Sequence, residues 1–140
     1  MKILKKIERL AVDANPILSA IIGGSARTVF IKSESTTFYT STFNYREVEK
    51  YIPILASKRD IPIDDLYLAL SMLPLRIYKY DFYNDKVKQA KGLIEKRDKD
   101  DFHLLALALK LGCPIWSNDK DFDGLGIMVY STLDLIKERG

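Results

Sequence analysis

The chain has 140 residues, 47% of them hydrophobic and 29% charged, and its formal net charge is +3. This composition supports a buried core and excludes an intrinsically disordered chain, while the mild positive charge permits a polyanionic partner without requiring one. We expect a single domain over residues 1–140 that opens with a basic lead-in over residues 1–7.

Cysteine content and hydropathy restrict where the protein works. Cys113 is the only cysteine, so the chain forms no internal disulfide and suits a reducing compartment. No apolar run approaches the roughly 18 residues of a membrane span, and no signal peptide precedes the first predicted strand. We expect a soluble, cytoplasmic protein without membrane contact.

The first predicted strand covers residues 9–13 and ends on an acid, Asp13. Asn15 is a typical helix cap and Pro16 is favoured at a first helical position, so a helix is expected over residues 17–23. Asp13 would then lie in the turn from strand to helix, where parallel α/β folds keep their chemistry. A structural turn acid is the alternative explanation for Asp13 alone.

The second predicted strand covers residues 38–41, which are rich in β-branched and aromatic side chains. Thr42 or Asn44 would cap a helix over residues 46–58. Glu47 would lie in the first turn of that helix, at the same edge of the sheet as the acid that ends the first strand. By itself, Glu47 would most often be a solvated first-turn acid that the helix dipole favours.

The middle of the chain alternates helices and strands. Residues 27–33 fit either a helix or a strand, because their periodicity does not decide. A helix is expected over residues 63–73, a strand over 75–80, and a helix over 82–97 that Asp81 caps. The last helix has a basic outer face, which a solvated surface explains and which would also suit a phosphate backbone. This face consists of Lys86, Lys88, Lys91 and Lys96.

An acidic stretch opens the last third of the chain. A helix over residues 102–111 would begin at Asp100 or Asp101, and a glycine and a proline follow its last turn. Residues 114–117 then form a short buried strand that leads to Asp119. Because helix starts and strand ends share one edge of a parallel sheet, Asp101 and Asp119 should face a common crevice.

The remaining chain adds a strand over residues 127–131 and a helix over residues 132–140, for which Thr132 is the expected cap. About five strands thus alternate with helices. This order predicts a three-layer α/β/α sandwich around a central, mostly parallel five-stranded sheet.

Four acids should meet at one edge of this sheet. Their mutual repulsion would raise their pKa values unless a cation neutralised them. An oxygen-only donor set suits Mg²⁺ or Mn²⁺, and the lack of paired cysteine and histidine argues against zinc. Such ions activate water and stabilise the charge on a phosphodiester, which predicts hydrolysis of a nucleic-acid backbone. The four acids are Asp13, Glu47, Asp101 and Asp119.

Other phosphate chemistries fit the residues less well. A haloacid-dehalogenase-type phosphatase needs a second acid two residues after the first, where Asn15 stands. A receiver domain needs adjacent acids after its first strand. No glycine-rich phosphate loop is present. The only histidine, His103, falls inside a helix beyond the edge, which excludes a Ser/His/Asp arrangement.

From Leu10 to about Leu135 the chain resembles a PIN-domain ribonuclease, the family that includes VapC-type toxins. The resemblance rests on an ordered set of segments rather than on one motif. In the third segment, the spacing to the alanine-rich helix selects Asp101 over Asp98 and Asp100. The segments are VDANPILSAIIGG, YREVEKY, RDKDDFHLLALAL and IWSNDKDF.

The resemblance implies a role for each of the four acids. Asp13, Asp101 and Asp119 would hold Mg²⁺ or Mn²⁺, and Glu47 would bind a second ion or position the attacking water. RNA would be cleaved to leave a 5′-phosphate and a 3′-hydroxyl, by an endonuclease rather than an exonuclease.

The resemblance also implies supporting residues and partners. Ser117 would orient Asp119 or a scissile phosphate, Asp121 would add an outer acid, and Asn15 would support Asp13 through a hydrogen bond. The family commonly forms homodimers, and its toxins bind an antitoxin. Two alternatives stay open: a catalytically silent PIN-like module that binds RNA or a protein, and a small-molecule phosphohydrolase.

Overall fold

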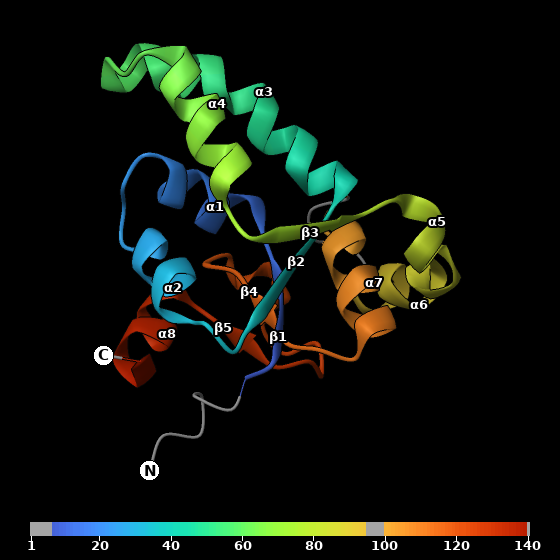
Figure 1. Cartoon of the computed structure of the whole chain (residues 1–140). Coiled ribbons are helices and arrows are strands. Elements are labelled where there is room, and N and C mark those ends of the chain that lie inside the picture. Colours follow the sequence, from blue (N-terminus) through green and yellow to red (C-terminus); the bar gives the residue numbers. More distant parts are fainter. Residues whose placement is uncertain (1–6, 95–99, 140) are drawn as a thin grey trace.

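The structure is a computed structural model and describes residues 7–94 and 100–139. Most of the basic lead-in, residues 1–6, lies outside the described residues, as do Asp98 and Lys96. Helices cover both faces of a central sheet, which gives three layers (Figure 1). None of the helices in the described part of the chain is long and apolar enough to cross a membrane.

The sheet has five strands in the order β3-β2-β1-β4-β5, and every neighbouring pair is parallel. The chain builds outward from β1 to β3 and then returns to the other side of β1. The carboxyl ends of β1 and β4 therefore flank the point where the strand order reverses, the usual place for a site in such sheets. The predicted fold class is confirmed. The strands are β1 (Arg9–Val12), β2 (Thr37–Ser41), β3 (Leu75–Tyr78), β4 (Ile115–Trp116) and β5 (Val129–Tyr130).

Two groups of helices form the outer layers, and α3 and α4 extend together beyond the sheet (Figure 1). One group packs in the core that contains Trp116: α1 (Ala14–Ile21), α2 (Ala26–Lys32), α3 (Thr42–Arg59), α4 (Ile63–Met72) and α8 (Thr132–Arg139). The other covers the opposite face: α5 (Tyr80–Tyr83), α6 (Val87–Ile94) and α7 (Phe102–Leu111), with the 3₁₀ turn η2 (Asn84–Lys86) between α5 and α6. A further 3₁₀ turn, η3 (Lys120–Phe122), follows β4.

Strand β1 joins the two cores because its side chains alternate between the faces of the sheet. Leu10 and Val12 belong to the core under α1, and Ala11 to the core under α7. Trp116 of β4 is fully buried, and its ring lies 4.9 Å from that of Phe30. Both faces of the central strands are therefore buried by apolar side chains, and polar groups lie where the strands end.

Two helices start at other residues than the sequence suggests. Asp13, and not Asn15, caps α1, because its Oδ1 accepts the Ala14 N–H at 2.8 Å. Ser41 caps α3, where Thr42 or Asn44 was expected. In both cases the cap is the last residue before the strand turns into the helix, so a shorter loop than predicted connects the two.

The structure decides one prediction that was left open and contradicts two others. Residues 27–33, which the periodicity left open, are helical in α2. The helix predicted over 82–97 is broken, since α5, η2 and α6 replace it and α6 ends at Ile94 among the described residues. Thr132 does not cap α8; Ser131 Oγ accepts the Asp134 N–H at 3.0 Å.

Candidate metal centre

Three carboxylates gather at the carboxyl edge of the sheet. Asp101, Asp119 and Asp121 each offer one oxygen atom, and these atoms lie within 4.8 Å of one another. All three side chains are half-buried. The structure thus brings together Asp101 and Asp119, as expected, and adds Asp121, which the sequence suggested only as an outer acid.

Local backbone structure explains why these acids face one another. Asp101 stands just before α7, but its side chain makes no capping hydrogen bond to that helix. Asp119 caps η3, because its Oδ1 accepts the Asp121 N–H at 2.9 Å. This tight turn holds Asp119 and Asp121 on the same side of the loop that follows β4, opposite the start of α7.

Ser117 connects Asp13 to this triad. Its Oγ donates to Asp13 Oδ2 at 2.7 Å and accepts the Asp119 N–H at 2.9 Å. One buried hydroxyl therefore bonds the acid that ends β1 and the backbone of the acid that follows β4. Ser117 was expected to orient Asp119 or a phosphate, and the structure places it against both Asp13 and Asp119.

Asn44 is a site residue that sequence reasoning missed. It is only 4% exposed, and its Nδ2 lies 3.5 Å from Asp13 Oδ1. Asn15, the residue expected to support Asp13, is exposed in the first turn of α1. Only its position in the chain could have indicated this role. Asn44 is the third residue of α3, and its side chain reaches back over the end of β2.

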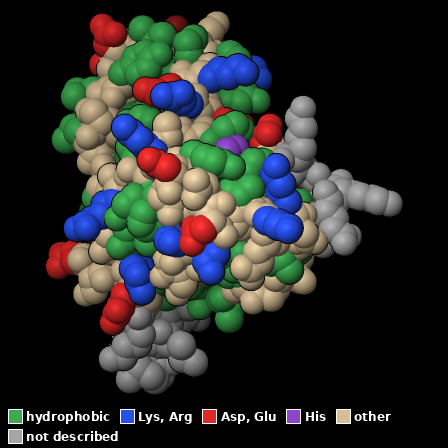
Figure 2. All heavy atoms as spheres, turned by 90° about the vertical axis from the view of Figure 1, so that its right-hand side faces the viewer, with side chains coloured by type: hydrophobic (Ala, Val, Ile, Leu, Met, Phe, Trp, Pro, Cys, Tyr) green, Lys and Arg blue, Asp and Glu red, His purple; other side chains and the backbone are tan. Residues whose placement is uncertain are grey.

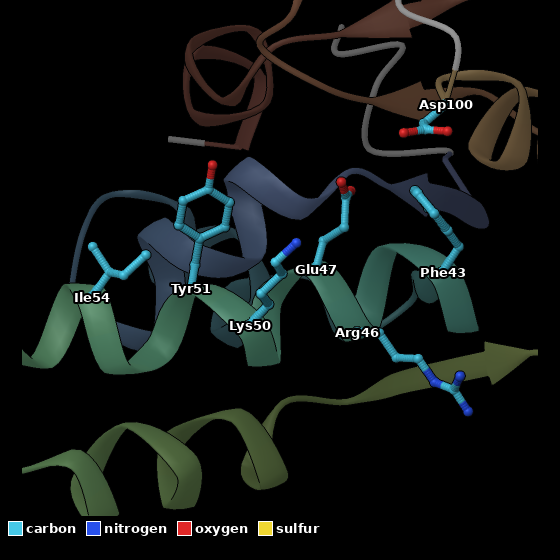
Figure 3. Close-up of a pocket in the computed structure, with 7 residues that line it drawn as sticks. All are labelled: Phe43, Arg46, Glu47, Lys50, Tyr51, Ile54 and Asp100. Atoms are coloured by element: carbon cyan, nitrogen blue, oxygen red, sulfur yellow. The ribbon is translucent and has the colours of Figure 1, made fainter.

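Glu47 lies beside the triad rather than in it. It lines a cavity of about 520 Å³ together with five other residues of α3 and with Asp100. Figure 3 shows Glu47, Lys50 and Tyr51 rising from the same side of α3, whereas Arg46 points the opposite way. Asp100 is the residue before Asp101, so one wall of the cavity comes from the segment that carries the first acid of the triad.

An aromatic cluster borders the same region. The His103 ring stacks on Phe43 and Phe102, with 4.1 Å between ring centroids in each case. Burial lowers the pKa of His103 most, and nearby Lys91 lowers it further, although Asp100 opposes both effects. The histidine shows at the surface among hydrophobic side chains, on a face where lysines and arginines are scattered (Figure 2).

Comparison with known proteins places the chain in a family. A model described as the PIN domain matches residues 11–139, nearly the whole chain. The chain belongs to the PIN-domain family. The membership suggested by the four sequence segments is confirmed. No curated protein sequence gives a significant match to this PIN domain.

Solved structures share the fold of this PIN domain but little of its sequence. A chain from a toxin–antitoxin complex of Klebsiella pneumoniae has a TM-score of 0.65 and 17% identity, over 88% of this chain and 97% of that one. A chain of VapBC2 from Rickettsia felis, bound to a DNA fragment from its promoter, has a TM-score of 0.63 and 14% identity, over 88% and 98%. VapC20 from Mycobacterium tuberculosis, a toxin that cleaves the sarcin–ricin loop, has a TM-score of 0.58 and 16% identity, over 85% and 96%.

The donor chemistry of the triad fits a hard divalent cation. All three side chains of the PIN-domain triad offer carboxylate oxygen, the ligand that Mg²⁺ and Mn²⁺ prefer. Soft ligands are placed elsewhere: Cys113 is buried beside Ala11, and burial raises the pKa of its thiol to about 11. The site therefore suits an ion that binds oxygen, and its acids would be neutralised by one.

Proposed function

We propose that this PIN domain is a Mg²⁺- or Mn²⁺-dependent ribonuclease that hydrolyses RNA phosphodiester bonds as an endonuclease. The observation that carries the proposal is the grouping of the Asp101, Asp119 and Asp121 carboxylates, to which Ser117 joins Asp13. Membership of the PIN-domain family supports it. One structure with the same fold is a toxin that cleaves the sarcin–ricin loop, which favours RNA as the substrate.

In this proposal Asp13, Asp101 and Asp119 hold the metal, and Asp121 completes the triad. A bound divalent cation supplies a water of lowered pKa and stabilises the charge that develops on the phosphate. Glu47, which faces the cavity from α3, binds a second ion or orients the attacking water. Cleavage leaves a 5′-phosphate and a 3′-hydroxyl.

The cavity on α3 provides a place for the RNA beside the acids. Lys50 offers an ammonium group for a phosphate, and Tyr51 offers a half-exposed ring on which an unpaired base can stack. Single-stranded RNA is bound by this combination of cationic and aromatic side chains. RNA lying along α3 would pass the acidic triad where Asp100 meets Asp101.

The proposal is tested with labelled RNA oligonucleotides in Mg²⁺, in Mn²⁺ and in EDTA. We expect cleavage with either ion and none with EDTA. Asp13→Asn and Asp119→Asn should each lower the rate by more than about 100-fold, because even outer-shell partners of a metal ligand contribute 10–100-fold. Asp64→Asn, an exposed acid in the first turn of α4, is the matched control.

Two results would count against this mechanism: cleavage that persists in EDTA, and full activity of Asp13→Asn. RNA binding that persists without any binding of divalent ions would instead favour a catalytically silent RNA-binding module. Phosphatase activity on small substrates in place of RNA cleavage would favour a phosphohydrolase.

We further propose that the protein is a toxin that pairs with an antitoxin and forms a homodimer. The support for the antitoxin is that similar structures come from a toxin–antitoxin complex and from VapBC2. Light scattering after size-exclusion chromatography should give the mass of a dimer, twice the 16.0 kDa of the chain. A small gene for a DNA-binding protein immediately upstream would support the antitoxin, and a monomer mass would contradict the dimer.

A further inference from the structure

A chain of polar side chains runs through the interior from α7 to Asp13. Its members are His103 of α7, Tyr83 of α5, Ser41 at the end of β2 and Asn44 of α3. Tyr83, Ser41 and Asn44 are 1%, 0% and 4% exposed. Buried polar groups are costly unless they are hydrogen-bonded, so each of them needs a partner inside the protein.

The end of the chain at Asp13 fixes the orientation of Asn44. A carboxylate only accepts hydrogen bonds, so the Asn44 group that faces Asp13 Oδ1 at 3.5 Å is the Nδ2 amide donor. Asn44 Oδ1 then faces Ser41, whose hydroxyl donates to it at 2.5 Å. Ser41 Oγ also accepts the backbone N–H of Asn44 at 3.0 Å. The single proton of Ser41 is thereby committed to Asn44.

Tyr83 is the next buried polar side chain. Its hydroxyl lies 2.8 Å from His103 Nδ1. Burial raises the pKa of Tyr83 most, and an interaction with Ser41 opposes that rise. Tyr83 therefore lies near Ser41 and joins it to His103 of α7.

The chain holds the Asp13 carboxylate from the side opposite Ser117. Oδ1 of Asp13 is bonded by the Ala14 N–H and by Asn44, and Oδ2 is bonded by Ser117. Donors on both oxygens fix the rotation of the carboxylate about its Cβ–Cγ bond. The far end of the chain lies on α7, two residues after Asp101, so the chain also links the two elements that carry Asp13 and Asp101.

We propose that Asn44 is a positioning residue for the metal centre and that Ser41 and Tyr83 support it. Asn44 does not touch RNA or metal; it acts by orienting Asp13, as outer-shell partners orient the ligands of other metal sites. This inference rests on the proposed function, in which Asp13 is a metal ligand. It adds a requirement for a polar network that the four acids alone do not specify.

Two variants test the role of the network. Asn44→Ala removes the donor to Asp13, and Tyr83→Phe deletes one hydroxyl while keeping the ring. We expect Asn44→Ala to weaken Mn²⁺ binding, measured by calorimetry, by about 10-fold, and to lower kcat with little change in KM for RNA. Tyr83→Phe should act in the same direction and less strongly. Tyr39→Phe, the same change at another buried tyrosine, is the matched control.

Nitrogen NMR tests the link between Tyr83 and His103 without any cleavage assay. His103 is the only histidine, so its ring nitrogens give unambiguous signals. We expect a shift of the Nδ1 signal in Tyr83→Phe but not in Tyr39→Phe, because the Tyr83 hydroxyl is the partner of Nδ1. An unchanged Nδ1 signal in Tyr83→Phe would remove Tyr83 and His103 from the network.

The outcomes separate this inference from the proposed function. If the wild type binds Mn²⁺ and cleaves RNA, but both network variants match it in Mn²⁺ affinity and kcat, only the positioning role is wrong. If the wild type binds no divalent ion, the metal centre and the positioning role fall together. Thermal unfolding of each variant shows that it is folded, and Tyr83→Phe keeps the test valid if Asn44→Ala does not fold.

Discussion

Asp13 performs a structural task and a proposed chemical one with the same carboxylate. It caps α1 through the Ala14 N–H and accepts hydrogen bonds from Ser117 and Asn44. Both strand β1 and helix α1 therefore converge on this side chain. Substitutions at Asp13 must be chosen so that loss of chemistry is distinguished from loss of folding.

The choice of substitution at Asp13 should separate these two effects. Asparagine is as good a helix cap as aspartate, whereas replacing a cap by alanine lowers stability by about 1 kcal/mol. We expect Asp13→Ala to be less stable than Asp13→Asn in urea unfolding, although both abolish metal-dependent cleavage. Equal stability of the two variants would show that the cap contributes nothing here.

Cys113 gives the protein a pH-dependent stability. Its side chain is 5% exposed, and burial raises the pKa of the thiol from near 9 to about 11. In that range the folded protein keeps the proton and the unfolded chain loses it, so the free energy of unfolding falls as the pH rises. Below pH 9 both states are protonated and the effect is absent.

This dependence is measured by comparing the wild type with Cys113→Ala in urea between about pH 8 and pH 11. The wild type should lose more stability over this range, by on the order of 2 kcal/mol, because each pKa unit corresponds to 1.36 kcal/mol. Parallel curves would contradict the shift. At pH 8 the native thiol should resist alkylation until the protein is unfolded.

At the residue scale, the sequence predicted the acids whose positions depend on the edge of the sheet. It did not predict the residues whose positions depend on the conformation of a loop. Asp101 and Asp119 come together because a helix start and a strand end share one edge of a parallel sheet. Asp121 joins them only through the tight turn that Asp119 caps, and no periodicity encodes that turn. Asn44 was considered only as a cap, since nothing in the sequence shows which polar side chains turn inward.

At the scale of elements, α3 presents one face to the proposed substrate. Phe43, Glu47, Lys50, Tyr51 and Ile54 recur at helical spacing and all line the cavity. This face differs from a buried one because it mixes charged and aromatic side chains, and Tyr51 is 50% exposed. The helix thus places its binding groups in the same row as Glu47.

Substitution of Tyr51 tests this role of α3. Tyr51→Ala should weaken RNA binding by about 5- to 100-fold, because stacking on an aromatic ring contributes about 1–3 kcal/mol per base. Binding is measured by fluorescence anisotropy in an Asp119→Asn background, which prevents cleavage. Tyr67→Ala, an exposed tyrosine on α4, is the matched control. If both variants bind RNA equally well, the cavity is not the RNA-binding site.

Helices and strands were predictable where the hydrophobic periodicity and the turn residues, such as glycine and proline, agree. Gly112 ends α7 with a left-handed backbone, φ +65°, as its position after the apolar run suggested. The segment predicted as one helix over 82–97 breaks instead at η2. Tyr83 is the reason visible in the structure, because this residue turns fully inward and its hydroxyl lies 2.8 Å from His103 Nδ1.

For the whole molecule, the alternation of helices and strands was enough to predict three layers and a parallel sheet. Strand order was not predictable in the same way, because it depends on which strands pair across the sheet. The order β3-β2-β1-β4-β5 puts β1 at the centre and makes β4 its second neighbour. That single pairing joins Asp13 to Ser117 and Asp119, more than 100 residues away.

The central position of β1 also sets when the acidic centre can exist during synthesis. A nascent chain that has emerged only as far as α7 contains Asp13, Glu47 and Asp101, but it lacks β4, Ser117 and Asp119. The pairing of β1 with β4 must wait until β4 has left the ribosome. For the proposed ribonuclease, a chain that has emerged only as far as α7 therefore lacks part of its metal centre.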